Sequence, residues 1–259
     1  MTADRAAVAV RVRADRFYQR MALTCLAVGI IGFTPTYWLP LVRGTIQVHP
    51  WTHVHALFFY GWLGLFVTQT SLAASGRIVR HRELGVLGVA IASGMCFVGL
   101  GMTVHSLKSS IALGFGDAAR AFSIVSATAI VLFAALVAVA IARVKTPEVH
   151  KRLMLVATAS VLQAAVGRWF LLFLAPRPAG GVSQGALGPP PVAVTVGPGL
   201  VVDLLIVAAM VYDRRTRGRV HAVYWIAGGI VLAVQVLRVP LSSTSAWIAI
   251  TNWLLAIAP

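Results

Sequence analysis

The distribution of positive charge is the feature of this sequence that most constrains its fold. Sixteen of the 22 Lys and Arg residues fall in four short clusters, and long apolar stretches separate these clusters. The predicted connections between apolar stretches alternate, so that one carries a cluster and the next is nearly free of charge. This pattern is typical of a protein that crosses the membrane several times with its basic loops in the cytoplasm. The four clusters lie within 5–20, 77–82, 143–152 and 214–219.

The composition agrees with a membrane protein. Apolar residues make up 59% of the chain and charged residues 11%, whereas roughly a quarter of a soluble domain is charged. A net charge of +15 would also suit a nucleic-acid-binding protein. However, the basic residues flank hydrophobic spans, where anionic lipid headgroups supply the opposite charge. We therefore expect the partner to be the lipid bilayer and expect no nucleic acid.

The sequence predicts an all-α, polytopic membrane bundle of seven transmembrane helices. Each span needs about 20 apolar residues to cross roughly 30 Å of hydrocarbon. An odd number of spans, combined with the basic clusters, places the N-terminus inside and the C-terminus outside. The expected spans are Met21–Leu41, Trp51–Ala74, Leu84–Val104, Ala118–Ala142, Leu153–Ala175, Gly199–Tyr212 and Ala222–Val239.

The chain divides into three parts by composition. Residues 1–20 form a basic cytoplasmic segment, and residues 21–239 form a single transmembrane domain. Within this domain, residues 176–198 are rich in Pro and Gly, and we expect them to form an external loop, because irregular backbone cannot face lipid. The apolar segment 240–259 is either an interfacial helix or an eighth span. Its polar beginning, at 242–245, favours the interfacial helix.

Four histidines are expected at the outer membrane face. His49, His53 and His55 lie at the start of the second span, and His105 lies at the end of the third. Imidazole is a common ligand for iron, copper and zinc. The sequence therefore indicates a metal site at His53, His55 and His105, with His55 and His105 as ligands if the cofactor is haem. Alternatively, these side chains only form hydrogen bonds with headgroups and helix ends.

A second pair of histidines is expected at the inner face. His81 and His150 each open a span next to a basic cluster. His81 and His105 are 24 residues apart on one predicted helix, which separates them by about 36 Å. They cannot share a site, so we expect His81 and His150 to bind a cofactor at the inner face.

Three charged residues are expected within the outer halves of the spans, namely Arg168, Asp203 and Arg238. A charge inside a membrane usually faces a partner or a functional site. Asp203 is the only carboxylate in a predicted span, so we expect it to pair with Arg168, with Arg238 as the rival. The alternatives are a clamp for an anion or a haem propionate, since Arg binds carboxylates through two N–H groups, or the gate of a transporter.

Three short motifs resemble those of known families. The stretch His53-Val-His55-Ala-Leu-Phe-Phe-Tyr-Gly-Trp, with Gly76-Arg-Ile-Val-Arg-His81-Arg-Glu-Leu-Gly and His150-Lys-Arg-Leu-Met154, resembles a group of bacterial integral membrane proteins without an established activity. The His-Arg-x-Leu-Gly and His-Lys-x-x-Met elements are similar to those of small membrane proteins of cytochrome oxidase maturation, in a different order. The Trp51-x-His53-x-His55 element resembles the haem–copper membrane family of the nitric-oxide response. The resemblance implies a multi-pass protein of a bacterial inner membrane.

Three functions follow as hypotheses. The first is a membrane protein that binds haem b or copper and acts in electron transfer or in the assembly of a respiratory complex. The second is a structural accessory subunit of a larger membrane complex or of a homo-oligomer. The third is a transporter of small solutes. The sequence contains no GxSxG, phosphate-loop or HExxH motif that would identify an enzyme.

Overall fold

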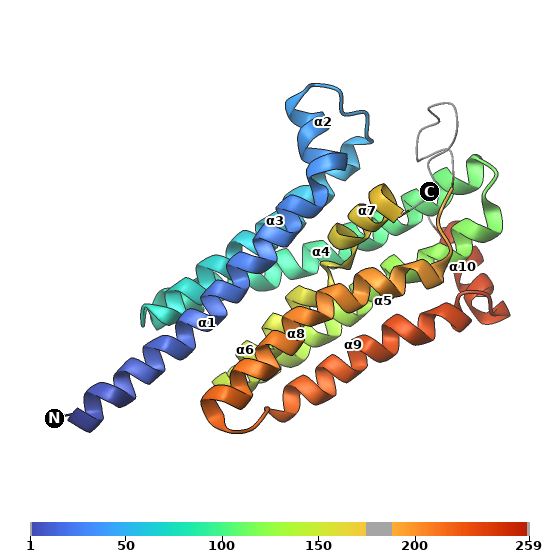
Figure 1. The fold of residues 1–259 in the computed structure, drawn as a ribbon. Coiled ribbons are helices and arrows are strands. Elements are labelled where there is room, and N and C mark those ends of the chain that lie inside the picture. The colour runs from blue at the N-terminus through green and yellow to red at the C-terminus, as the bar shows by residue number, and fades with distance from the viewer. Residues whose placement is uncertain (1, 175–187, 258–259) are drawn as a thin grey trace.

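The described part of the chain is built from helices (Figure 1). The computed structural model describes residues 2–174 and 188–257, with side chains from residue 16 onward. The long helices are α1 (Thr2–Phe33), α3 (Pro50–Ala74), α4 (Ile78–Ala112), α5 (Gly116–Ala142), α6 (Pro147–Ser160), α7 (Gln163–Leu174), α8 (Val196–Arg217), α9 (Ala222–Leu241) and α10 (Ser245–Ile257). Shorter elements are the π-helix η1 (Thr34–Trp38), α2 (Leu39–Val42) and the 3-10 helix η3 (Val192–Thr195).

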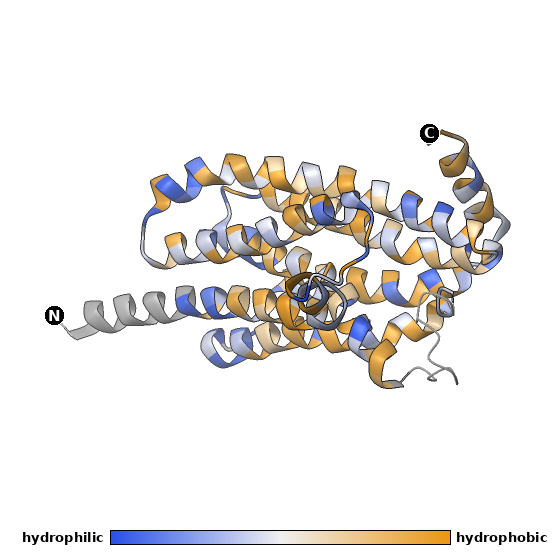
Figure 2. Ribbon diagram, turned by 90° about the horizontal axis from the view of Figure 1, so that it is seen from above, coloured by the Kyte–Doolittle hydropathy of each residue, from blue (hydrophilic) through white to orange (hydrophobic). Residues whose placement is uncertain are grey.

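Seven helical segments of the described chain are long and apolar enough to cross a membrane, which confirms the predicted class. Figure 2 shows apolar residues along the lengths of these helices. Their bounds are Arg16–Val42, Pro50–Ala74, Ile78–Ala112, Gly116–Ala142, Pro147–Phe173, Val192–Arg217 and Ala222–Leu241.

One expected boundary was wrong. The sixth span begins at Val192 rather than Gly199, and Pro198 is a buried residue of α8 instead of the end of an external loop. Proline is tolerated there because the first turn of a helix needs no N–H donors. The fifth span is present as Pro147–Phe173, but it consists of two helices, since α6 ends at Ser160 and α7 begins at Gln163. Residues 176–187 of the expected loop lie outside the described residues.

The turns fall at two ends of the bundle. The α3–α4, α5–α6 and α8–α9 turns lie at the end where α1 begins (Figure 1). We call this the basic end, because three of the four basic clusters lie in these turns and the fourth lies at the start of α1. The segment before α3, the α4–α5 turn and η3 lie at the opposite end.

Glycine allows α4 to approach its neighbours closely. A Cβ atom added at Gly94 would collide with the ring of Phe58 on α3, and one at Gly99 would lie 2.6 Å from Ile130 Cδ1 on α5. Small residues of this kind let membrane helices pack backbone against side chain. The middle of α4 is therefore fixed between α3 and α5.

The C-terminal helix α10 folds against the beginning of α5. Trp247 Nε1 donates a hydrogen bond to the carbonyl oxygen of Arg120 (2.8 Å), and Arg120 Nε donates one to Asn252 Oδ1 (3.2 Å). The 13 residues of α10 extend for about 20 Å, which is less than the roughly 30 Å of a bilayer core. The described part of α10 is therefore shorter than the core of a bilayer. Its location at the membrane interface stays a prediction.

Candidate functional site

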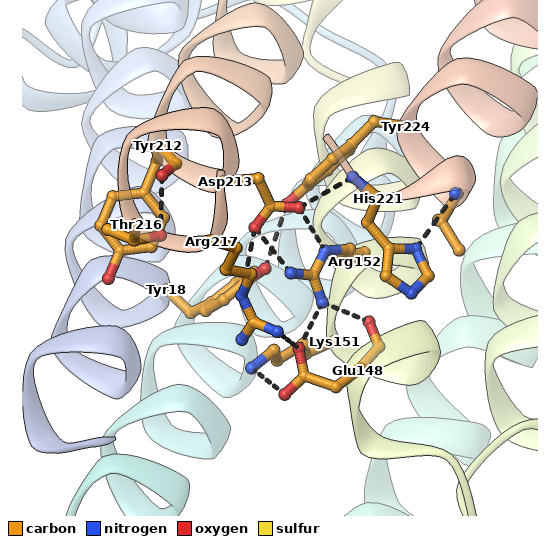
Figure 3. Close-up of polar contacts among 11 residues, drawn as sticks. Tyr18, Glu148, Lys151, Arg152, Tyr212, Asp213, Thr216, Arg217, His221 and Tyr224 are labelled. Atoms are coloured by element: carbon orange, nitrogen blue, oxygen red, sulfur yellow. Dashed lines mark hydrogen bonds and ion pairs between the residues drawn. The ribbon is translucent and has the colours of Figure 1, made fainter. Parts of the chain in front are cut away.

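A buried ion pair joins α6 to α8 at the basic end (Figure 3). The side chains of Arg152 and Asp213 are 0% and 1% exposed. Arg152 Nε donates to Asp213 Oδ2 (2.9 Å), and Arg152 Nη2 donates to Asp213 Oδ1 (2.6 Å). Two parallel N–H···O bonds of this kind form the strongest Arg–carboxylate geometry. The pair fixes the beginning of α6 against the last turns of α8.

Glu148 extends this ion pair toward the surface. Its Oε2 atom accepts from Arg152 Nη1 (2.6 Å) and lies 2.7 Å from Arg217 Nη1, while its Oε1 accepts from Lys151 Nζ (2.7 Å). Two carboxylates thus hold three cations. We call these five side chains the ion-pair cluster: Glu148, Lys151, Arg152, Asp213 and Arg217.

Aromatic residues and His221 surround the ion-pair cluster. The hydroxyl groups of Tyr18 and Tyr224 lie 3.1 Å apart, and the Arg152 guanidinium lies 5.6 Å from the centre of the Tyr224 ring. The backbone N–H of His221 donates to Asp213 Oδ2 (3.2 Å). Partial burial, and then the charge of Arg152, lower the pKa of the His221 side chain below its usual value. The cluster therefore connects α1, α6, α8 and the start of α9.

The structure brings the two predicted inner histidines together. His81 lies in the first turn of α4 and His150 in the first turn of α6. The centres of their rings are 6.5 Å apart, and the rings are perpendicular. Both side chains are half-buried. The pair bridges two helices that are not neighbours in the sequence.

Main-chain carbonyl groups orient both rings. His81 Nδ1 lies 3.2 Å from the carbonyl oxygen of Gln69, and His150 Nδ1 lies 2.8 Å from that of Ala140. A carbonyl oxygen only accepts hydrogen bonds, so each Nδ1 must carry the proton. In the neutral ring, this leaves the lone pair on Nε2. Metal-binding histidines commonly have this arrangement, in which the second nitrogen donates to a carbonyl or carboxylate group.

The outer histidines do not form the expected metal site. The His105 ring lies 4.6 Å from the His49 ring, centre to centre, at a tilt of 39°. His53 Nδ1 forms a hydrogen bond with the hydroxyl of Tyr37 (2.9 Å), and His55 stacks on Phe59. Within the described residues, no group of three or more His, Cys, Asp or Glu side chains could hold a metal ion. The three-ligand site predicted at His53, His55 and His105 is therefore not formed.

His49 also differs from the inner histidines in the role of its Nδ1 atom, which accepts a hydrogen bond instead of donating one. Its Nδ1 accepts a hydrogen bond from the backbone N–H of Trp51 (3.2 Å) and caps the start of α3. The lone pair of Nδ1 is occupied, so the proton of the neutral ring lies on Nε2. The pair His49–His105 is thus less suited to bind a metal than the pair His81–His150.

The predicted ion pair between Arg168 and Asp203 is not formed. Asp203 Oδ1 accepts a hydrogen bond from Gln235 Nε2 (3.2 Å). Arg168 Nε donates to Thr36 Oγ1 (3.0 Å), and Arg168 Nη1 donates to the carbonyl oxygen of Ala164 (2.7 Å). Among the described residues, neither charge takes part in an ion pair.

Arg238 is almost fully buried, at 2% exposure. Its Nη2 donates to Thr195 Oγ1 (2.8 Å), while its Nε and the neighbouring Gln235 Oε1 have no hydrogen-bond partner. The Gln235–Asp203 hydrogen bond connects α9 with α8, and the Arg238–Thr195 hydrogen bond connects α9 with η3.

Comparisons with known proteins give no relative for this chain. No family model matches it, and it has no significant similarity to a curated protein or to a solved structure.

Proposed function

We propose that this chain is a membrane-embedded protein that binds copper or haem b through His81 and His150. The observation that carries this proposal is the pair of hydrogen bonds from Nδ1 to the carbonyl oxygens of Gln69 and Ala140. These bonds leave an Nε2 lone pair on two side chains whose ring centres are 6.5 Å apart. Two metal–nitrogen bonds of about 2 Å, with the radii of both rings, span a similar distance.

The number of ligands restricts the metal. A structural zinc site needs four protein ligands and a catalytic one needs three, but the described residues offer no group of three. Two imidazoles suit a copper(I) ion or the two axial positions of haem iron. When bound, either group supplies one-electron redox chemistry. The proposed role is electron transfer or the assembly of a respiratory complex.

The ion-pair cluster supports the pair by fixing α6. His150 precedes Lys151 and Arg152, which are held by Glu148 and Asp213. The first turn of α6 is therefore attached to α8 on one face while His150 projects toward His81. A ligand held by fixed neighbours binds a metal more tightly than a mobile one.

The test is the optical spectrum and the metal content of the purified protein. We expect His81→Ala and His150→Ala each to remove the bound metal, while the control His49→Ala keeps it. A Soret band with a reducible α band identifies haem, and copper without these bands identifies copper(I). Equal metal content in the three variants, or no metal in the protein after expression with haem and copper supplied, would overturn the proposal.

A further inference from the structure

Arg168 on α7 has no counter-ion among the side chains that the structure describes. Outside these side chains, segments 175–187 and 258–259 contain no Asp or Glu, and Asp4 and Asp15 belong to the start of α1 at the basic end. The described carboxylates beyond the basic end are engaged elsewhere, since Asp117 lies 3.6 Å from Arg120 and Asp203 accepts from Gln235. An Arg within a membrane span needs a negative partner or a wet cavity. This guanidinium is therefore available to a negative group from outside the chain.

The contacts of Arg168 hold its side chain but leave donors free. Its guanidinium carbon lies 3.8 Å from the centre of the Phe33 ring, and Thr36 and Ala164 accept from Nε and Nη1. A guanidinium has five N–H groups, and Nη2 makes no hydrogen bond with the described residues. The Phe33 ring and the two acceptors therefore fix the direction in which the free N–H groups of the guanidinium point.

An irregular turn of the first span organises this region. In the π-helix Thr34–Trp38, Pro35 lacks the N–H group that a regular α-helix would need. Three consecutive side chains of this turn contact three different residues: Thr36 accepts from Arg168, the Tyr37 hydroxyl bonds with His53, and Trp38 donates to the Tyr60 hydroxyl. Single π-helical turns of this kind are common at functional sites.

His55 supplies an unsatisfied polar atom close to the same charge. Its Nδ1 is buried without a hydrogen-bond partner, its ring stacks on Phe59 with centres 4.1 Å apart, and Arg168 lies within electrostatic range of it. A buried polar atom without a partner is costly. A bound group that contacts Arg168 and His55 would satisfy both.

We propose that Arg168 and His55, positioned by the turn Thr34–Trp38, bind the oxyanion headgroup of an amphiphile. Arg pairs with phosphate and carboxylate oxygens through two N–H groups, so the ligand carries one of these groups. Exposed apolar side chains on the adjoining helices, Leu39, Val42 and Phe173, offer a surface to an acyl chain. The site is at the opposite end from His81 and His150 and does not depend on the metal proposal.

Lipid binding by native mass spectrometry tests this site. Delipidated protein in detergent is titrated with phosphatidylglycerol, and the variant Arg168→Gln is compared with Arg120→Gln. Arg120 is the matched control, because it lies at the same end but is paired with Asp117. We expect Arg168→Gln to bind phosphatidylglycerol at least tenfold more weakly and Arg120→Gln to bind it as the unchanged protein does. Equal affinity in Arg168→Gln and the unchanged protein would overturn the proposal.

Inorganic phosphate and a neutral lipid separate the possible ligands. Competition by millimolar phosphate would overturn the amphiphile and identify a free oxyanion as the ligand, whereas lipid binding that phosphate does not reduce supports the amphiphile. Phosphatidylcholine that binds the unchanged protein as tightly as phosphatidylglycerol also contradicts it. If Arg168→Gln does not fold, Arg168→Lys and His55→Phe replace it. Arg168→Lys keeps the charge but loses the planar fork. Weaker binding in both variants supports the site, and unchanged binding in both overturns it.

Discussion

A guanidinium that is removed from solvent must have acceptors for its N–H groups. Arg152 meets this requirement with the two oxygens of Asp213, one oxygen of Glu148 and the main-chain carbonyl of Glu148. Removing one partner of a buried pair leaves the other charge desolvated, which costs more than removing both. The stability of the basic end therefore depends on keeping both members of this pair.

The Arg152–Asp213 pair gives the first prediction. We expect Asp213→Asn and Arg152→Met each to destabilise the detergent-solubilised protein by about 3–5 kcal/mol, and the double variant to be less destabilised than the sum. The measurement is unfolding in a denaturing detergent, followed by circular dichroism. Asp117→Asn is the control, since Asp117 is fully exposed and surface changes usually cost less than about 0.5 kcal/mol. Additive losses would show that the pair is not coupled.

A second prediction concerns Asp203. Because Gln235 rather than Arg168 contacts it, we expect the losses from Asp203→Asn and Arg168→Gln to add within about 0.5 kcal/mol. Asp203→Asn and Gln235→Leu, in contrast, should show a coupling energy of about 0.5 kcal/mol or more. The same unfolding assay measures the free energy of unfolding of the three single and two double variants. Coupling of Asp203 with Arg168 would contradict the hydrogen bond of Asp203 with Gln235.

The charged residues show what the sequence could and could not predict. Asp203 was visible because it interrupts an apolar stretch. Asp213 is not visible in this way, because it directly precedes Arg214 and Arg215 and lies at the edge of a basic cluster. In the structure α8 continues to Arg217, so Asp213 still lies on a helix and faces Arg152. Mean hydropathy does not report which face of a terminal helical turn is buried.

At the scale of elements, helix ends position the two inner histidines. The first turns of α4 and α6 present His81 and His150, and the carbonyl groups that orient these rings come from the ends of the preceding spans, at Gln69 and Ala140. The sequence placed both histidines at helix starts on one face of the membrane. It could not show that the α3–α4 and α5–α6 hairpins bring these two starts together, because that depends on the packing of α4 against α5.

The start of α9 gives a pH-dependent prediction. His221 Nδ1 accepts a hydrogen bond from the backbone N–H of Val223 (3.2 Å), and protonation of Nδ1 removes this cap. The pKa of His221 is lowered in the folded protein, so the unfolded state binds more protons at mildly acidic pH. The cap is therefore fully present above the unfolded pKa of about 6.5 and is lost as the pH falls below it.

Substitution of His221 isolates this effect. A helix cap contributes about 1 kcal/mol, and Asn accepts the same hydrogen bond without titrating. We expect His221→Asn to lose less stability than the unchanged protein between pH 7.5 and pH 5.5, measured by thermal unfolding at both pH values. His221→Ala lacks the cap at both pH values. Its stability at pH 7.5 should therefore be lower than that of His221→Asn, but its loss of stability between pH 7.5 and pH 5.5 should be equally small. An equal pH dependence in all three proteins would exclude His221 as the group responsible.

The two ends of the molecule differ in how positive charges are paired. At the basic end, Arg152 and Arg217 form ion pairs with Asp213 and Glu148, and we expect anionic lipid headgroups to neutralise the other cations. At the opposite end, Arg168 lies within a span and has no carboxylate partner among the described side chains. The basic clusters, together with the apolar stretches between them, predict the spans and their orientation from the sequence. The contacts of Arg168 depend on how α1, α3 and α7 pack, which the sequence does not show.

Orientation is the last prediction, and it follows from the basic turns. We expect the α3–α4 and α5–α6 turns to face the cytoplasm and the α4–α5 turn to face outward. Single cysteines are introduced at Ser75, Thr146 and Leu113, which are exposed, in a background with Cys25→Ala and Cys96→Ala. An impermeant maleimide added to intact spheroplasts should label Leu113→Cys. It should label Ser75→Cys and Thr146→Cys only after the membrane is permeabilised. The reverse labelling would invert the bundle and place the pair His81–His150 at the outer face.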